Sequence, residues 1–248
     1  MAAWKKIFFL HIPKTAGSAF NQMFKPCMPQ GRYFEHMESR RELVKKITDD
    51  GEPFFLSGHL PYFSARAIVE RADIVSITIV RNPWDQFVSH IKWLKFVGSP
   101  VFPTKDKILP SIMELSRALY DVPLHDMPSI IRTIDTAIGH RLLDNLQVRH
   151  LMSKSSDGVS AADAAQATIN MNKFTLAFAL DDMDWAWRQL RAQLPALAPI
   201  TRHNEARIDG EIDLRNAESN AIILPWIVHD LTLYDAVRQH SGRISAAA

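Results

Sequence analysis

The chain has 248 residues, of which 47% are hydrophobic and 23% are charged, which are the proportions of an ordinary globular protein. Its net charge of only +2 excludes the strongly basic proteins that coat nucleic acids, so we expect no nucleic-acid partner. The length predicts a single domain over residues 1–248.

The cellular compartment is predicted from what the chain lacks. Its one cysteine, Cys27, cannot form an intramolecular disulfide and fits a reducing environment. No apolar run approaches the roughly 18 residues that cross a bilayer. No signal-peptide pattern precedes residue 7. We therefore expect a cytoplasmic protein without a membrane span.

The first element is an apolar run over residues 7–10, which predicts a short buried strand. A loop follows it and leads into a helix predicted over residues 18–24. The exposed N–H groups at a helix N-terminus bind anions, and Lys14 adds a full positive charge beside them. The pattern favours a phosphate site at this loop, and the alternative is an ordinary strand–turn–helix joint with a surface lysine. The candidate ligand-binding residues are Pro13, Lys14, Thr15, Ala16, Gly17 and Ser18.

Three further elements precede residue 81. Ser39 and Glu42 form a capping-box pattern that predicts a helix through Ile47. Residues 53–57 predict a second strand, residues 64–71 a helix, and the β-branched run 73–80 a third strand. Because strands alternate with helices, we predict an α/β fold with a parallel sheet flanked by helices.

Polar side chains follow each of these three strands. Lys14, His59 and Arg81 all stand just beyond a strand's carboxyl end. In parallel sheets the carboxyl ends meet at one edge, where ligands bind. The sequence therefore predicts that these three side chains lie at one site.

The second half of the chain is predicted to be largely helical. Pro83 begins a helix, residues 98–110 form a long loop, and residues 112–152 have a mostly helical pattern. A second capping-box pair, Ser160 and Asp163, opens another helix. A fourth strand over residues 174–180 is followed by helices over residues 181–194 and 221–240.

Arg81 and Ser89 form a second candidate anion site. A planar guanidinium grips a phosphate with two hydrogen bonds, and a nearby hydroxyl can add a third donor. The alternative is that Arg81 caps a helix or pairs with Asp85. Enzymes that use Mg²⁺ and a nucleoside triphosphate keep an aspartate near a strand end, where this chain has Arg81. We therefore predict no metal site.

The stretch His-Ile-Pro-Lys-Thr-Ala-Gly-Ser, from His11 to Ser18, resembles the 5′-phosphosulfate loop of sulfotransferases that use 3′-phosphoadenosine 5′-phosphosulfate. It is most similar to the branch of heparan sulfate 2-O-sulfotransferase and its bacterial relatives. Arg81 and Ser89 resemble the family's 3′-phosphate segment. The resemblance implies a P-loop-type fold, 3′-phosphoadenosine 5′-phosphosulfate as donor and 3′-phosphoadenosine 5′-phosphate as product.

The resemblance also implies roles for single residues. Lys14 would stabilise the leaving oxygen, and His59, in a Ser-Gly-His stretch, matches the family's general base. The alternative for His59 is a strand-end histidine that only bonds the backbone. Two positions depart from the family, since Gln86 replaces a frequent arginine and Ala19 a second hydroxyl. We expect slightly weaker donor binding as a result.

The acceptor is predicted only as a class, a hydroxyl on a carbohydrate, lipid or small metabolite. His11 precedes the loop and is a candidate acceptor contact. Asn145 and Arg149 belong to a stretch that resembles the family's Asn-x-Gln-x-Arg pattern and are further candidates, although a plain polar helix face explains them as well. Residues 25–38, 98–110 and 200–215 are expected to shape the acceptor pocket.

Two other functions remain open at this point. The first is a kinase-like P-loop phosphotransferase, which would need Mg²⁺ and bind ATP without a 3′-phosphate. The second is a nucleotide-binding module that has lost turnover. Binding of 3′-phosphoadenosine 5′-phosphate compared with ADP, with and without Mg²⁺, would separate the enzymes, and sulfate transfer would test the module.

Overall fold

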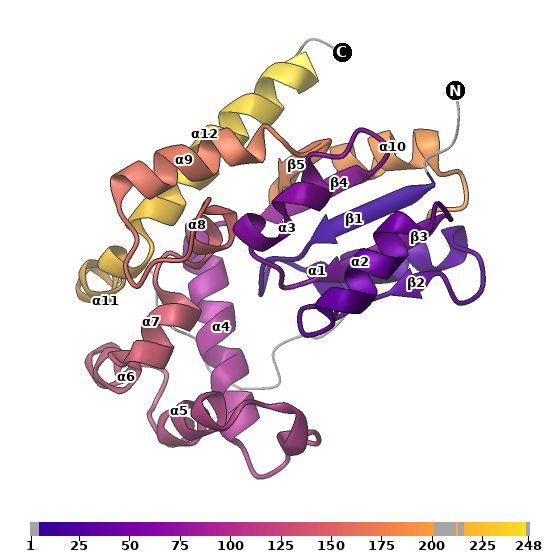
Figure 1. The fold of residues 1–248 in the computed structure, drawn as a ribbon. Coiled ribbons are helices and arrows are strands. Elements are labelled where there is room, and N and C mark those ends of the chain that lie inside the picture. The colour runs from indigo at the N-terminus through magenta and orange to yellow at the C-terminus, as the bar shows by residue number, and fades with distance from the viewer. Residues whose placement is uncertain (1–4, 201–211, 213–215, 247–248) are drawn as a thin grey trace.

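A computed structural model describes residues 5–200, 212 and 216–246, and it is built on a parallel sheet (Figure 1). The five strands follow the spatial order β2-β3-β1-β4-β5, with β1 in the centre. Every neighbouring pair is parallel, so all strands end at the same edge of the sheet. The strands are β1 Lys6–Leu10, β2 Tyr33–Phe34, β3 Phe54–Gly58, β4 Val75–Val80 and β5 Leu176–Ala179.

Helices fill most of the remaining described chain. Seven of them follow in order to residue 143: α1 Gly17–Phe24, α2 Arg41–Asp49, α3 Tyr62–Val69, α4 Pro83–Gly98, α5 Pro110–Tyr120, α6 Met127–Ile134 and α7 Ala137–Leu143. The others are α8 Leu146–Leu151, α9 Ala161–Met171, α10 Met183–Gln193, α11 Ala217–Ile223 and α12 Val228–Ala246. No helix among the described residues is long and apolar enough to cross a membrane.

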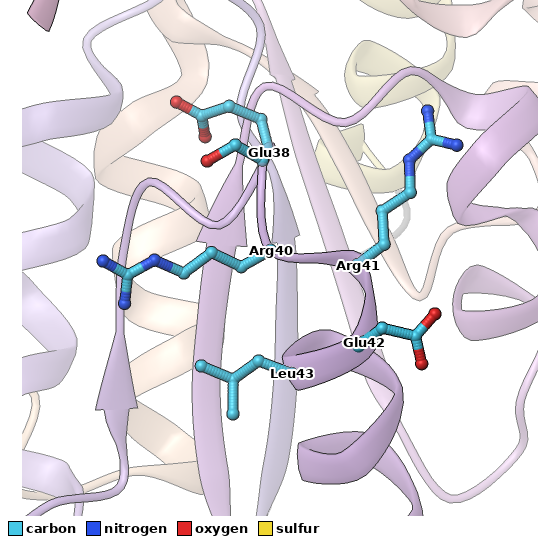
Figure 2. Close-up of a pocket in the computed structure, with 6 residues that line it drawn as sticks. Glu38, Arg40, Arg41, Glu42 and Leu43 are labelled. Atoms are coloured by element: carbon cyan, nitrogen blue, oxygen red, sulfur yellow. The ribbon is translucent and has the colours of Figure 1, made fainter.

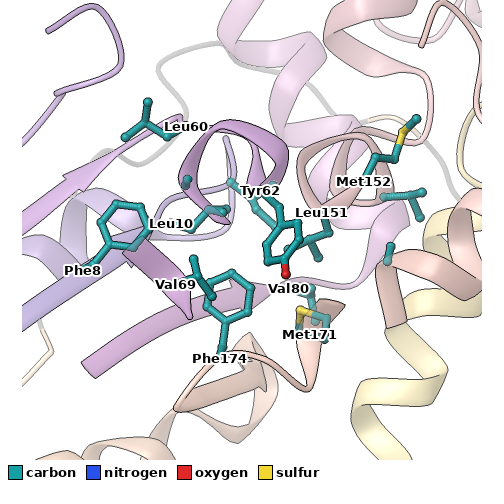
Figure 3. Close-up of a cluster of buried hydrophobic side chains, with 14 of the residues drawn as sticks. Phe8, Leu10, Leu60, Tyr62, Val69, Val80, Leu151, Met152, Met171 and Phe174 are labelled. Atoms are coloured by element: carbon teal, nitrogen blue, oxygen red, sulfur yellow. The ribbon is translucent and has the colours of Figure 1, made fainter. Parts of the chain in front are cut away.

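The two faces of the sheet are covered by different helices because successive strand residues point to opposite sides. Phe8 and Leu10 of β1 pack against α2, α3, α8, α9 and α12. Figure 3 shows this cluster, with Tyr62 of α3 and Phe174 close to the strands. Ile7 and Phe9 face the other way and pack against α1 and α10. Both faces are thus buried, which explains why the strands are mostly apolar.

A third apolar cluster lies outside the sheet. It joins side chains of α4 to those of α5, α6, α7 and α11. Figure 1 shows these helices gathered away from the strands, with α4 leading from the sheet into them. Since α4 begins just after β4, this group of helices is held to the same sheet edge as the loop after β1.

The predicted fold class, a parallel sheet flanked by helices with a largely helical second half, is confirmed. Predicted strands match within two residues at each end, and the Ser160–Asp163 capping box is present. The Ser39–Glu42 box is wrong, because α2 begins at Arg41 after an N-cap residue, Arg40, that makes no side-chain cap. The sequence also missed β2, whose two residues are too few to show a period.

Candidate functional site

The loop between β1 and α1 has an unusual backbone. Lys14 and Ala16 both have a φ of 67°, in the left-handed region that side chains rarely adopt. A Cβ on Gly17 would lie 1.8 Å from Nε2 of His11, so only glycine lets α1 begin this close to that ring. Strain of this kind costs free energy and is common at ligand sites.

The N-terminus of α1 offers hydrogen-bond donors. No side chain caps this helix, whose first N–H groups lack partners within the helix. Ser18 is half-buried, and its hydroxyl has no partner among the described residues. The hydroxyl of Thr15 differs from our expectation: it is buried and donates to the Ile12 carbonyl at 2.9 Å. Thr15 therefore holds the loop with its hydroxyl and leaves only its backbone N–H for an anion.

The end of β4 is bonded to this loop. The Nη1 atom of Arg81 donates to the Lys14 carbonyl at 3.1 Å. Gln86, from the first turns of α4, donates to the Pro13 carbonyl at 3.1 Å. Gln86, which stands where the sulfotransferases often have an arginine, thus helps to hold the loop after β1 in place. The contacts bring Lys14 and Arg81, which are 67 residues apart, into one site.

The two cations at this site are not paired with a carboxylate among the described residues, and Asp85 and Asp181 act on Arg81 only from a distance. Burial, together with the charge of Arg81, lowers the pKa of Lys14 from 10.5 to about 8. No ion pair joins Lys14 or Arg81 to a carboxylate in the described part of the chain, so the Arg81–Asp85 pair considered above does not form. Ser89 lies in α4, half-buried, with no hydrogen-bond partner among the described residues. Like charges held together in a partly buried place favour binding of an anion.

His59 follows β3 and is held in one tautomer. Its Nδ1 lies 2.7 Å from the His11 carbonyl. Because a carbonyl can only accept, Nδ1 carries the proton, and Nε2 of the neutral ring keeps its lone pair. Burial lowers the pKa of His59 below 6.5, so the ring is neutral at pH 7. This ring makes the expected backbone bond and also retains a nitrogen that can accept a proton.

Other histidines surround His59. The ring of His11 is 4.3 Å from it, measured between centroids, and the ring of His36 is 6.4 Å from it. Burial, followed by the charge of Lys14, lowers the pKa of His90 to about 3, and burial lowers that of His150 to about 4. His59, His90 and His150 are therefore neutral at pH 7, and Lys14 and Arg81 carry the positive charge beside them. From the sequence, His90 is only a weaker candidate that a structural role explains as well, and His150 has no role, because no local pattern marks a helix residue that lies near a distant loop.

The polar side-chain atoms of Asn145 and Arg149 are hydrogen-bonded within the protein. The Oδ1 atom of Asn145 accepts from the backbone N–H of His229 at 2.7 Å and of Asp230 at 3.1 Å, and its Nδ2 donates to Asp144. Arg149 pairs with Asp144 at 2.7 Å and donates to the Ser156 carbonyl at 2.7 Å. Their polar atoms connect the start and the end of α8 to other parts of the chain, and the expected acceptor contact stays a prediction.

A surface hollow lies near His59. It is lined by residues 38–43, and Figure 2 shows the side chains of Arg40 and Arg41 pointing away from each other. Glu38, on its rim, accepts a hydrogen bond from the backbone N–H of His59 at 3.3 Å. Of the loops expected to shape the acceptor pocket, residues 201–211 and 213–215 lie outside the described residues.

Comparisons with known proteins add one finding. No protein-family model matches the chain, and no curated protein matches it. Among solved structures, it is similar to the mouse sulfotransferase SULT7A1, whose crystal structure is complexed with PAP. The two share 14% identity over 89% of this chain and 64% of that chain, with a TM-score of 0.40. This chain thus spans less than two thirds of that protein, and a likeness this weak carries no functional conclusion.

Proposed function

We propose that this protein is a sulfotransferase that moves the sulfuryl group of 3′-phosphoadenosine 5′-phosphosulfate to an acceptor hydroxyl. The proposal depends on one observation. Lys14 and Arg81 lie together, neither of them in an ion pair with a described carboxylate, beside the uncapped N-terminus of α1 and near the neutral ring of His59. An anionic nucleotide would supply the missing negative charge, and a base nearby suits an attacking hydroxyl.

The roles follow from the chemistry of each group. The backbone N–H groups of residues 15–18, with the Ser18 hydroxyl, would hold the 5′-phosphate, and Arg81 with Ser89 the 3′-phosphate. His59 would take the proton of the acceptor hydroxyl at Nε2 as the new oxygen–sulfur bond forms. The bond between sulfur and the 5′-phosphate oxygen breaks, and Lys14 would stabilise the charge that this oxygen acquires. The proton thus goes to His59, and the leaving group is 3′-phosphoadenosine 5′-phosphate.

Calorimetry on the full chain tests the donor. We expect 3′-phosphoadenosine 5′-phosphate to bind at least about tenfold more tightly than ADP, with no gain from Mg²⁺, because a 3′-phosphate adds charge-assisted hydrogen bonds. Tighter binding of ADP that depends on Mg²⁺ would instead support a kinase-like P-loop phosphotransferase.

Transfer of labelled sulfate to a panel of hydroxyl compounds tests the reaction. We would assay sugars, lipids and small metabolites separately, since the acceptor class is open. Sulfated product from any of them supports an enzyme. Tight nucleotide binding with no product from the panel, and no slow donor hydrolysis, would support a module without turnover.

A further inference from the structure

Gln147 of α8 makes a contact that no part of the proposed mechanism uses. Its side chain is completely buried and reaches the end of β4. Its Oε1 accepts from the Arg81 N–H at 2.8 Å, and its Nε2 donates to the Arg81 carbonyl at 2.8 Å. One amide therefore satisfies both backbone groups of Arg81.

This contact stands where the sheet ends. The paired register of β4 stops at Val80, which lies opposite Ala179 of β5, and on the other side it stops at Thr78. Arg81 has left the strand ladder that would have fixed its backbone. The amide of Gln147 replaces a neighbouring strand at this position, since it presents an acceptor and a donor with the spacing of a peptide group.

Gln147 is itself held by a buried carboxylate. Asp230, in α12, accepts from the backbone N–H of Gln147 at 3.1 Å and of Val148 at 2.7 Å. These are the second and third N–H groups of α8, which begins at Leu146, so Asp230 caps this short helix from another part of the chain. Only 1% of the Asp230 surface is exposed, so water does not compete for these two hydrogen bonds. The connection runs from α12 through α8 to the residue that holds the 3′-phosphate in the proposed function.

We propose that Gln147, fixed by Asp230, is a positioning residue for Arg81 and sets the preference for a nucleotide with a 3′-phosphate. The inference rests on the proposed function. The guanidinium of Arg81 is within hydrogen-bond reach of the loop only because its backbone is held at the strand end. Loss of the amide would free that backbone and lower the affinity for the 3′-phosphate alone.

The test compares two nucleotides that differ only in that group, 3′-phosphoadenosine 5′-phosphate and adenosine 5′-phosphate. Their dissociation constants are measured on the full chain for the wild type, Gln147→Met and Gln147→Glu. Met keeps the length and removes both hydrogen bonds, so we expect the preference for the 3′-phosphate to fall about tenfold while adenosine 5′-phosphate binds as before. Glu keeps an acceptor for the Arg81 N–H, so we expect a smaller fall in the preference for the 3′-phosphate. The Glu variant provides the test if the Met variant does not fold.

Asn170→Ala is the matched control. This buried amide donates to the Leu151 carbonyl at the other end of α8 at 2.6 Å and makes no hydrogen bond to Arg81. Its loss should lower the melting temperature and leave the preference unchanged. An unchanged preference in Gln147→Met, or an equal loss for both nucleotides, would overturn the inference alone. A wild type that binds both nucleotides equally would overturn the proposed function, and the inference with it.

Discussion

Two polar segments that look alike in the sequence differ in how their side chains are used. In the loop at residues 13–18, the Lys14 ammonium and the Ser18 hydroxyl have no partner among the described residues. In the segment at residues 144–149, Asn145, Gln147 and Arg149 are bonded to residues outside the segment. Residue type predicts that a group needs a partner, and only the structure tells whether the protein supplies it. The first segment keeps hydrogen-bonding groups available for the proposed ligand, and the second uses its own within the protein.

The sharpest test of this difference is Lys14→Met. We expect transfer to fall at least about 100-fold, since a charge at the leaving oxygen is lost. Yet the ligand-free protein should become more stable by roughly 1 kcal/mol, because a buried ammonium beside Arg81 is removed. Rates and thermal unfolding are measured together, with exposed Lys46→Met as control. A less stable variant would show that Lys14 has a partner in the protein.

His59→Ala removes the proposed base without touching the nucleotide. We expect turnover to fall about 100-fold or more, as for other general bases, while 3′-phosphoadenosine 5′-phosphate binds within about threefold of the wild type. Steady-state rates and calorimetry separate the two effects. His125→Ala, which alters an exposed histidine between α5 and α6, is the control. Unchanged turnover would remove His59 as the base.

Arg81→Ala should act mainly on the donor. We expect its affinity to fall about 10- to 100-fold, the value of hydrogen bonds to charged groups, with turnover at saturating donor changed less. The KM for the donor and the kcat at saturating donor are measured together. An equal fall for nucleotides with and without the 3′-phosphate would contradict the role given to Arg81.

The pH dependence of kcat/KM tests both charges of the site. His59 must be neutral, and burial puts its pKa below 6.5, so activity rises with pH on the acid side below that value. Lys14 must be protonated, so activity falls as the pH rises through about 8. Folding lowers the pKa of Lys14, so its buried ammonium destabilises the folded protein. This cost in unfolding free energy is full below pH 8 and disappears as the pH rises toward 10.5. A plateau that extends well past pH 9 would contradict the role of Lys14.

Arg149→Met tests the scaffold segment and should have the smallest effect on function. We expect a loss of about 2 kcal/mol in stability, because Asp144 and the Ser156 carbonyl lose their partner. Nucleotide affinity should stay within about twofold. Denaturant unfolding and calorimetry measure the two quantities. A selective loss of affinity would return Arg149 to the ligand site.

The sequence predicted the part of the molecule that local rules control. Apolar runs located the strands, and the parallel-sheet rule placed Lys14, His59 and Arg81 at one edge. It could not predict the contact of Gln147 with Arg81, because no local pattern links residues 66 positions apart. Nor could it separate the true capping box at Ser160 from the false one at Ser39, which share the same spacing.

The capping of α8 by Asp230 has a consequence for how the protein is made. During synthesis, β1, β3 and β4 leave the ribosome early, with the loop that carries Lys14. The carboxylate that fixes α8 emerges more than two hundred residues after that loop. A nascent or truncated chain that stops before α12 would have a sheet and both cations, but it would lack the Asp230 cap on the helix behind Arg81. The proposed donor site is therefore one of the last features of the molecule to be completed.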